Sequence, residues 1–337
     1  MFARNCWYVA AQSSELSQAP LARTLLGEPV VLYRTQTGAA VALEDRCCHK
    51  RAPLHRGSVV AEMIRCGYHG FEFDSAGICV RIPGLDTIPD NARVCSYPVV
   101  ERHRYIWIWM GDRSAADPAL VPDFHTNDDA AWAHTGARLA VAADYMLVIE
   151  NLLDLSHVGF IHANTIGSDD TSASIAWEST SDAVRGVRAA HDIETPPHNR
   201  RQGFGPRCDQ QKIMTFLPCS HVTIDITTTE RVPAGASQTA KGMHIMLLNS
   251  VTPETASSCH YFWSSTRDFA IDDPVVTEFF QSMTVRAFDE DRVMIEAQQR
   301  IIDRNPAAPT VTVLGDLGGV QARRRVAQRL LTETDTR

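Results

Sequence analysis

The stretch CCHKRAPLHRGSVVAEMIRCGYH, which runs from Cys47 to His69, holds two pairs of metal-binding side chains. The first pair is Cys47-x-His49 and the second is Cys66-x2-His69, with sixteen residues between His49 and Cys66. Four such ligands could hold zinc tetrahedrally, or a two-iron, two-sulfur cluster in which two histidines bind one iron. The spacing favours the cluster, because zinc fingers rarely join Cys to His through a single residue.

The chain around this stretch predicts a small antiparallel β domain. Runs of β-branched and aromatic residues alternate with glycines, which is typical of strands joined by turns. A small, polar segment from Gly111 to Pro118 indicates a domain boundary, so we expect one domain over residues 1–112 and a second over residues 113–337. The predicted strands of the first domain are Trp7–Ala10, Leu21–Leu26, Pro29–Tyr33, Ala40–Leu43, Val94–Val100 and Tyr105–Trp109.

Length and composition are those of a globular protein with two domains. The chain has 337 residues, of which 44% are hydrophobic and 21% are charged. Its net charge of -8, with no long basic run, argues against nucleic-acid binding. No apolar run approaches the length of a membrane span, and the first residues carry no secretory signal pattern. We therefore expect a cytoplasmic protein with neither a nucleic-acid nor a membrane partner.

The residues after the boundary mix helical and strand patterns. Residues 142–155 are apolar on nearly every face and predict a buried helix, and further helices are predicted over 274–304 and 319–332. Residues 164–210 are polar and irregular, and we expect a lid or a mobile loop there. Helices packed on an antiparallel sheet, and hence an α+β fold, follow from this pattern. The predicted strands are Lys212–Leu217, His221–Thr229, Met243–Leu248 and Cys259–Trp263.

A second set of polar side chains lies in Asn151-Leu-Leu-Asp154-Leu-Ser-His157-Val-Gly159-Phe-Ile-His162. Buried polar groups need partners, and a transition metal would satisfy two imidazoles in this apolar frame. Two core histidines bonded to backbone carbonyls would satisfy them equally well, and the segment alone does not decide between the two. His157 and His162 are about 140° apart on an ideal helix, so they converge only if the helix ends or widens, which Gly159 permits.

An open iron site with two histidines needs a carboxylate as its third ligand. Within the helix predicted over 274–304, Asp291 shares one face with Phe288 and Ile295. Asp289 and Glu290 share that apolar stripe less fully. A carboxylate on such a stripe is more often a paired structural group than a ligand, so the position alone leaves both roles open.

Both motifs resemble those of the Rieske non-haem iron oxygenases. The Cys/His pairs are similar to the cluster motif of Rieske proteins, although Cys48 stands where proline is usual. The pattern Asn-x2-Asp-x2-His-x4-His is similar to the mononuclear iron motif of the same family. Other segments resemble the vanillate O-demethylase oxygenase group, which includes dicamba demethylase and toluenesulfonate methyl-monooxygenase. These segments are Arg4–Ala10, Ile106–Asp112, Asp144–Leu147, Thr252–Thr255 and Gly319–Arg323.

The resemblance implies two metal centres with defined ligands. In the family, the third ligand of the mononuclear iron lies in a C-terminal helix. At that position of this chain, Asp291 is the first candidate, followed by Glu296 and then Asp289. The implied ligands of a [2Fe-2S] Rieske cluster are Cys47, His49, Cys66 and His69, and those of a mononuclear Fe(II) are His157, His162 and Asp291.

Two residues of the second motif have implied roles outside the metal shell. Asp154 would bridge His157 of one subunit to a cluster histidine of the next, His69, in a head-to-tail homotrimer. A carboxylate that accepts both ring N–H groups fixes their tautomers. Asn151 would orient a ligand or contact oxygen, and a hydrogen bond within the core is the alternative.

The implied function is the terminal oxygenase component of a two-component Rieske monooxygenase. Electrons from NADH would reach the cluster through a separate flavin/iron-sulfur reductase, and the enzyme would use O2 to hydroxylate a methoxy or methyl substituent of an aromatic carboxylate or sulfonate. His244, Asn249 and Ile161 are expected to contact this substrate. The alternatives are a ring-hydroxylating Rieske oxygenase, a Rieske electron-transfer protein without oxygenase activity, and a zinc-stapled binding protein.

Basic residues surround the cluster motif in an otherwise acidic chain. They would either balance the charge of thiolates and sulfides or form a docking patch for an acidic redox partner, and the sequence does not separate these roles. The residues are Arg46, Lys50, Arg51, Arg56 and Arg65.

Overall fold

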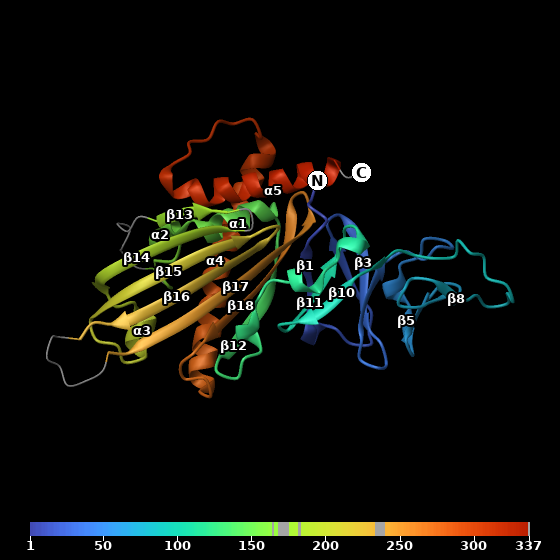
Figure 1. The fold of residues 1–337 in the computed structure, drawn as a ribbon, viewed down its shortest axis with the longest axis horizontal. Coiled ribbons are helices and arrows are strands. Elements are labelled where there is room, and N and C mark those ends of the chain that lie inside the picture. The colour runs from blue at the N-terminus through green and yellow to red at the C-terminus, as the bar shows by residue number, and fades with distance from the viewer. Residues whose placement is uncertain (164, 168–174, 181–182, 233–239, 336–337) are drawn as a thin grey trace. The chain divides into compact units, whose positions relative to one another are not determined.

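The computed structural model describes residues 1–163, 165–167, 175–180, 183–232 and 240–335. The chain forms two compact units. The first consists of Met1–Val121, Thr252–Ala256 and Glu333–Arg337, and the second of Pro122–Val251 and Ser257–Thr332. Both are built on antiparallel sheets, and helices pack on the sheet of the second, which confirms the predicted α+β fold (Figure 1).

Three small sheets make up the first unit. The first sheet contains β1 (Trp7–Gln12), β11 (Tyr105–Trp109) and β10 (Val99–Arg102) in that order; the second contains β2 (Leu21–Leu25), β3 (Glu28–Arg34), β4 (Ala40–Glu44) and β9 (Ser96–Tyr97); and the third contains β5 (Ser58–Val60), β6 (Met63–Arg65), β7 (Glu72–Phe73) and β8 (Cys79–Arg81). All five side chains of β11 are buried, so both its aromatic and its aliphatic face pack inside the unit.

The third sheet and the loops beside it share one hydrophobic core. Leu54, Ile64 and Phe73 are fully buried in this core, and the motif cysteines Cys47 and Cys66 belong to it. Burial of these apolar side chains is the main term that holds so small a sheet together. The loops that carry the Cys/His pairs are therefore anchored on packed residues at their cysteine ends.

One seven-stranded antiparallel sheet organises the second unit. Its strands are, in spatial order, β12 (Ala133–Val141), β18 (Ser258–Arg267), β17 (Gly242–Thr255), β16 (His221–Glu230), β15 (Arg207–Leu217), β14 (Val184–Glu194) and β13 (Ile175–Ser179). Neighbouring strands from β13 to β18 follow one another in sequence, so all of the sheet except β12 is a simple meander.

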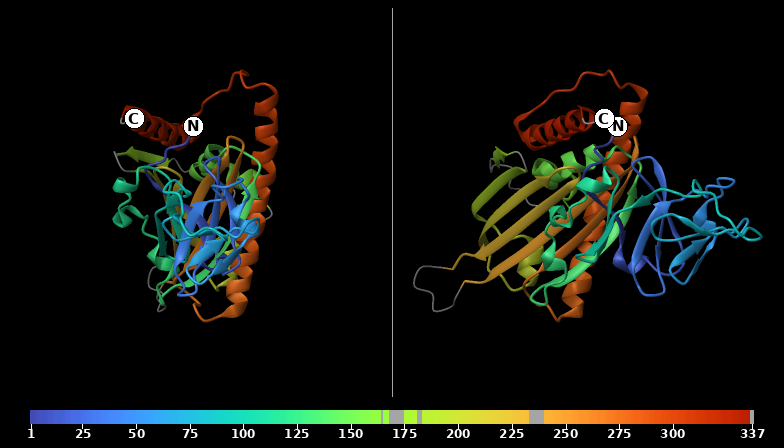
Figure 2. Two further views of the ribbon diagram at one scale, coloured as in Figure 1. Left: turned by 90° about the vertical axis from the view of Figure 1, so that its right-hand side faces the viewer. Right: turned by 45° about the vertical axis from the view of Figure 1, so that its right-hand side comes forward.

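The structure describes five α-helices, of which α1 and α4 pack on this sheet. They are α1 (Tyr145–Leu153), α2 (Val158–Ile161), α3 (Pro197–Arg201), α4 (Pro274–Arg304) and α5 (Leu317–Asp335). Helix α4, whose bounds match the predicted 274–304, runs along one face of the sheet (Figure 2). It begins where Asp273 accepts the N–H groups of Val275 and Val276, an N-cap that satisfies two otherwise unpaired donors.

The expected lid over residues 164–210 is wrong for the described part of that segment. Strands β13 and β14, helix α3 and the start of β15 lie there, whereas 164, 168–174 and 181–182 fall outside the described residues. The strands were missed because β14 combines exposed charges with a glycine. Gly186 of β14 packs under the Trp177 ring, since a Cβ at that position would lie 2.6 Å from a ring carbon.

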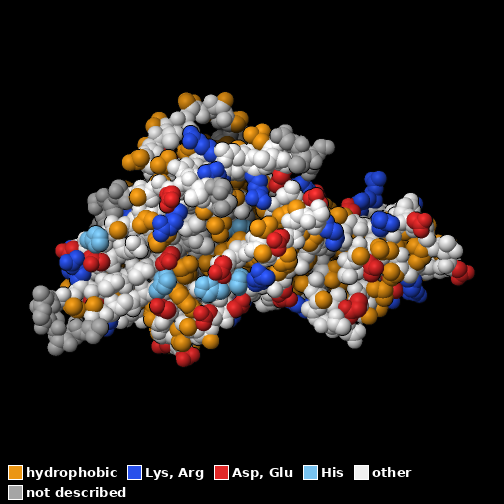
Figure 3. All heavy atoms as spheres, in the orientation of Figure 1, with side chains coloured by type: hydrophobic (Ala, Val, Ile, Leu, Met, Phe, Trp, Pro, Cys, Tyr) orange, Lys and Arg blue, Asp and Glu red, His pale blue; other side chains and the backbone are white. Residues whose placement is uncertain are grey.

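Acidic and basic side chains are interspersed over the face shown in Figure 3. Among the described residues, no helix is long and apolar enough to cross a membrane.

Candidate metal centres

Two loops of the first unit hold the Cys/His pairs in the same backbone geometry. In each loop the cysteine N–H donates to the carbonyl five residues later at 2.8 Å, and the cysteine carbonyl accepts the N–H four residues later, at 3.0 Å for Cys47 and 3.1 Å for Cys66. The residues that donate this second bond, Arg51 and Gly70, have φ angles of 59° and 73°. Such a φ costs a non-glycine residue roughly 1–2 kcal/mol, so the hydrogen bonds of the loop hold Arg51 in place. The two pairs are equivalent halves of one site.

The cysteines and histidines of these loops differ in exposure. Cys47 and Cys66 are buried, whereas His49 and His69 are exposed. The two imidazole centroids lie 4.6 Å apart, and Phe71 stacks on His49 at 4.9 Å. A [2Fe-2S] cluster with two thiolates on one iron and two imidazoles on the other fits this arrangement. It would place the histidine-bound iron at the surface, where a redox partner can approach.

The Cys47 thiol of this site is protonated until a metal binds. Burial raises the pKa of Cys47 to about 12, with a contribution from the Cys66 thiol, while the His49 N–H acts in the opposite direction. A bound metal ion deprotonates such a thiol outright. Burial also raises the pKa of Cys48, so this additional thiol beside the ligands is neutral at pH 7.

The second motif lies where the helices are short and broken. Helix α1 ends just before Asp154, whose carboxylate accepts the Ser156 N–H at 2.8 Å and caps the 3-10 helix η6 (Leu155–His157). Helix α2 follows directly and ends just before His162. Both histidines therefore lie at the end of a helix, and this position lets the side chains of His157 and His162 face a common point.

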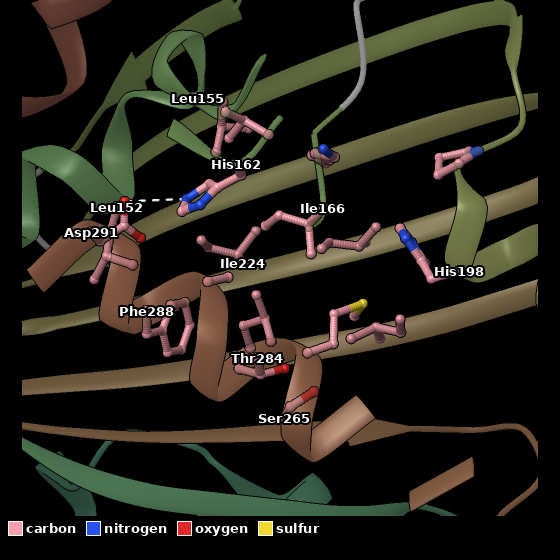
Figure 4. A pocket seen from close by; sticks show the side chains of 18 of the residues that line it. Leu152, Leu155, His162, Ile166, His198, Ile224, Ser265, Thr284, Phe288 and Asp291 are labelled. Carbon is pink, nitrogen blue, oxygen red and sulfur yellow. Dashed lines mark ion pairs between the residues drawn. The ribbon is translucent and has the colours of Figure 1, made fainter. Parts of the chain in front are cut away.

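The imidazoles of His157 and His162 converge on Asp291 of α4. Figure 4 shows the His162 ring facing Asp291. Asp291 Oδ1 lies 3.2 Å from His162 Nε2 and 3.5 Å from His157 Nε2. One candidate ligand atom from each of the three residues lies within 4.8 Å of the other two. Asn151 of α1 donates its amide N–H to the same carboxylate oxygen at 3.1 Å. Two imidazole nitrogens and one carboxylate at this spacing fit the facial triad that binds Fe(II).

His157 carries a buried polar atom that has no hydrogen-bond partner among the described residues. That atom is its Nδ1, whereas its Nε2 faces Asp291. Burial lowers the pKa of His157, although the carboxylates of Asp291 and Asp154 act in the opposite direction. The ring is therefore neutral at pH 7, which is the form that binds a metal.

His162 is held from both sides of its ring. Its Nδ1 lies 2.8 Å from Glu290 Oε2, and Thr165 donates its hydroxyl to the same oxygen at 2.8 Å. Burial lowers the pKa of His162, but the hydrogen bonds to Asp291 and Glu290 outweigh burial and raise the pKa above its usual value. A carboxylate on the second ring nitrogen fixes the tautomer and makes the metal-binding nitrogen more basic. Sequence reasoning missed this role of Glu290, for which its place beside Asp291 was the only signal.

A cavity of about 120 Å³ opens from this centre between α4 and the sheet. Its walls are mainly apolar, and α4 contributes one stripe of side chains spaced three or four residues apart. The lining residues are Asn151, Leu152, Leu155, His157, Val158, His162 and Ile166; Pro196 and His198; Gln210, Lys212, Ile224, Ile226, Thr228, Ile245, Leu247 and Ser265; and Phe280, Met283, Thr284, Ala287, Phe288 and Asp291.

The three predicted substrate contacts are not among these lining residues. His244 Nε2 lies 2.7 Å from Asp225 Oδ1. Asn249 is fully buried and accepts the Tyr261 hydroxyl at 2.7 Å. Ile161 is partly buried at the end of α2. The two polar side chains are therefore bonded elsewhere in the fold, and the structure does not bring them to the metal centre.

Several polar residues that do line the cavity were missed from the sequence, and three of them carry a nitrogen in the side chain. They are His198, which belongs to the short helix α3, and Gln210 and Lys212 of β15. Gln210 and Lys212 are two residues apart and so share one face of the strand. Nothing in the local pattern showed that this face is the inner one.

Two family models match the chain. Residues 6–98 match the Rieske [2Fe-2S] domain, and residues 141–332 match the vanillate O-demethylase oxygenase C-terminal domain. The first range contains both Cys/His pairs. The second contains His157, His162 and Asp291.

Similar proteins extend over nearly the whole chain. The iron-sulfur subunit of a toluene-4-sulfonate monooxygenase system from Comamonas testosteroni is 36% identical over 334 residues, which is 96% of this chain and 95% of that protein. A vanillate O-demethylase oxygenase subunit from Pseudomonas sp. (strain HR199 / DSM 7063) is 34% identical over 343 residues, which is 99% of this chain and 97% of that protein. The crystal structure of dicamba monooxygenase bound to dicamba aligns with a TM-score of 0.90, at 32% identity over 99% of both chains.

Proposed function

Because the chain belongs to the Rieske oxygenases that carry a vanillate O-demethylase oxygenase C-terminal domain, we propose that it is the terminal oxygenase of a two-component monooxygenase acting on a methoxy or methyl group of an aromatic acid. It is an iron-dependent oxidoreductase with a Rieske [2Fe-2S] cluster. The relatives named above act on toluenesulfonate and vanillate, which supports an aromatic carboxylate or sulfonate as the substrate of this chain.

One observation supports the proposal most strongly: two imidazoles and one carboxylate meet at the end of a largely apolar cavity. We assign the iron to His157, His162 and Asp291. Iron held there supplies the chemistry of dioxygen activation, and the cluster supplies stored electrons. A simple electron carrier needs neither a second centre nor a cavity beside it.

We assign the cluster to residues 1–112 and the iron site to residues 113–337. In the first, Cys47 and Cys66 hold one iron of the cluster from inside the core, and His49 and His69 hold the other at the surface. The exposed imidazoles are the entry point for electrons from a flavin/iron-sulfur reductase that oxidises NADH.

The second assignment concerns the path from cluster to iron. Asp154 joins His157 of one subunit to His69 of the next in a homotrimer, since the Nδ1 of His157 is buried without a hydrogen bond of standard geometry in the described structure, and Asp154 caps the short helix η6 that ends at His157. A carboxylate between two ring N–H groups fixes both tautomers. Asn151 orients Asp291 through its amide N–H. The protein works in the cytoplasm.

The reaction balances with one molecule of each reactant. One oxygen atom of O2 enters a substrate C–H bond, the other leaves as water, and NADH supplies two electrons. On a methyl group the product is the alcohol. On a methoxy group the product is a hemiacetal, which collapses to the phenol and formaldehyde.

The test is oxidation of a substrate panel by the holoenzyme with reductase, NADH and O2. Vanillate, methoxybenzoates, toluenesulfonate and dicamba are compared, and formaldehyde release separates methoxy from methyl oxidation. His157→Ala is the control, because it should retain the visible spectrum and acid-labile sulfide of the cluster while losing all product. A protein that binds zinc in place of iron and sulfide would contradict the proposal, as would a holoenzyme whose cluster is reduced by the reductase but which oxidises no aromatic acid with O2.

A further inference from the structure

Two hydroxyl groups on the wall of the cavity beside the iron site have no role in holding the metal. They belong to Thr284 of α4 and Ser265 of β18, which Figure 4 shows among the side chains that line the cavity. Thr284 is 6% exposed and Ser265 is 5% exposed. Neither hydroxyl makes a hydrogen bond within the described part of the chain, whereas Gln210 and Thr228 on the same wall bond to each other at 3.1 Å. We call Thr284 and Ser265 the hydroxyl pair.

The hydroxyl of Thr284 differs from that of another threonine in the same helix. A threonine hydroxyl inside a helix can donate to the carbonyl one turn earlier, and Thr277 does so, to Asp273 O at 2.9 Å. Thr284 makes no such bond to any described residue, and its side chain faces the cavity. A buried hydroxyl costs free energy unless water or a ligand pairs with it. This hydroxyl is therefore available to a molecule in the cavity.

Contacts between α4 and β18 place the hydroxyl pair at one level of the cavity. Trp263 of β18 packs on Phe288 of α4 at 5.4 Å between ring centroids. Four residues along the strand, Arg267 Cζ lies 5.8 Å from the centroid of the Phe280 ring. The serine lies midway between Trp263 and Arg267, on the same face of the strand. The threonine lies midway between Phe280 and Phe288, on the same face of the helix. The two hydroxyls therefore face one part of the cavity from opposite walls.

The hydroxyl pair lies two helical turns from the iron ligand of α4. Thr284 precedes Asp291 by seven residues, or about 10 Å along the helix axis. Between them Ala287 has the smallest side chain of the α4 stripe and leaves room for a flat group. The cavity measures about 120 Å³, which is close to the volume of about 150 Å³ that binds benzene. One aromatic ring beside Ala287 would have one edge toward the iron and the opposite edge toward the hydroxyl pair.

The hydroxyl pair complements an uncharged hydroxyl group better than an ionised acid. Each of the two side chains can donate one hydrogen bond and accept others. Together they can accept the O–H of a phenol and donate to its oxygen. Neither carries a charge that would offset an anion against the largely apolar wall. A phenolic hydroxyl on the edge of the ring that faces away from the iron is therefore the matching group.

We propose that Thr284 and Ser265 bind a hydroxyl group of the substrate ring, para to the methyl or methoxy group that is oxidised. The inference rests on the proposed oxygenase function and adds a substituent that the enzyme recognises and the two residues that recognise it. Both residues position the substrate and take no part in the oxidation itself. The contact is independent of where the acid group of the substrate lies.

The test compares two aromatic acids that differ only in the para substituent, 5-hydroxy-2-methoxybenzoate and 2-methoxy-5-methylbenzoate. Because they share the acid and methoxy groups, the contacts of those groups cancel in the comparison. Dissociation constants are measured by equilibrium dialysis with the holoenzyme, and kcat and KM are measured with reductase, NADH and O2. Thr284→Val and Ser265→Ala should each weaken binding of the hydroxy acid roughly three- to ten-fold and leave binding of the methyl acid unchanged. Thr284→Ser keeps the hydroxyl and should retain tight binding of the hydroxy acid.

The control variant is Ser282→Ala, which removes an exposed hydroxyl from the same helix and should change neither dissociation constant. Equal weakening of both acids in Thr284→Val and Ser265→Ala would overturn the proposal. Unchanged binding of both acids would overturn it too, since the hydroxyls would then only hold water, and so would a wild-type holoenzyme that binds neither acid. A holoenzyme that binds the acids as expected but oxidises neither of them would instead contradict the oxygenase function. The two failures are therefore distinguishable.

Discussion

Glu290 is the residue through which the surroundings of the iron site can be tested most directly. The substitution Glu290→Gln keeps the size of the side chain and removes its charge. Glu290 Oε2 accepts from both His162 Nδ1 and Thr165 Oγ1 at 2.8 Å. Hydrogen bonds to a charged group contribute about 1.5–3 kcal/mol, and the glutamine oxygen still accepts weaker bonds. We therefore expect a loss of about 1–2 kcal/mol, or roughly five- to thirty-fold in Fe(II) affinity.

The assay is the release of Fe(II) from the holoenzyme to a competing chelator. The absorbance of the Rieske cluster provides an internal reference, because the cluster should be unaffected. The matched control is Asp289→Asn, which removes the same charge one residue earlier on α4. Asp289 pairs with Arg292 at 2.6 Å and is half exposed, so its variant should retain iron as the wild type does. If both variants release iron at the same rate, Glu290 does not act through His162.

Three further predictions concern the remaining features of the two centres. Asp154→Asn should leave both metals bound, by iron and sulfide analysis, and abolish product formation; undiminished turnover would reject the bridge between subunits. Glu72→Gln should lower the melting temperature of the cluster absorbance at pH 7. Burial raises the pKa of Glu72, but the hydrogen bonds to Arg65 and Arg81 outweigh it and hold the pKa below its usual value. The charged Glu72 therefore stabilises the folded state, and this contribution is fully present above the unfolded-state pKa of about 4.3. The difference in melting temperature between Glu72→Gln and wild type should vanish as the pH falls through the folded-state pKa of Glu72. A difference that persists at that pH would show that the charge of Glu72 does not cause it. Arg56→Glu, near the cluster loops, should slow reduction by the reductase and flatten its salt dependence; an unchanged salt slope would favour simple charge compensation.

The sequence predicts best those features that depend on local spacing. Helix α4 was placed correctly because its apolar stripe repeats with the helical period and Asp273-Pro274 provides an N-cap and a first-turn proline. The four residues of the Cys/His pairs could be singled out for the same reason, since each pair lies in a single short loop. The small strands β5 to β8 were not predicted, because two or three residues carry no detectable period.

Features that depend on which face of a strand is inside could not be predicted. On β17, Ile245 and Leu247 line the cavity, whereas His244 points to Asp225. A shift of one residue moves a side chain to the other face of a sheet, and the sequence around His244 does not show which face the helix covers. The polar residues of the cavity wall, such as Lys212, escaped notice for the same reason.

The pair Glu290 and Asp291 shows what the fold adds to the helical pattern. Consecutive residues on a helix point about 100° apart, so two adjacent carboxylates cannot both lie on one apolar stripe. Both carboxylates can contact a single imidazole only if that ring lies over the helix surface between the two side chains. His162 has this position, with Nε2 toward Asp291 and Nδ1 toward Glu290. Because the ring is placed by the end of α2, more than a hundred residues away in sequence, no local reading of α4 separates the ligand from the residue that orients it.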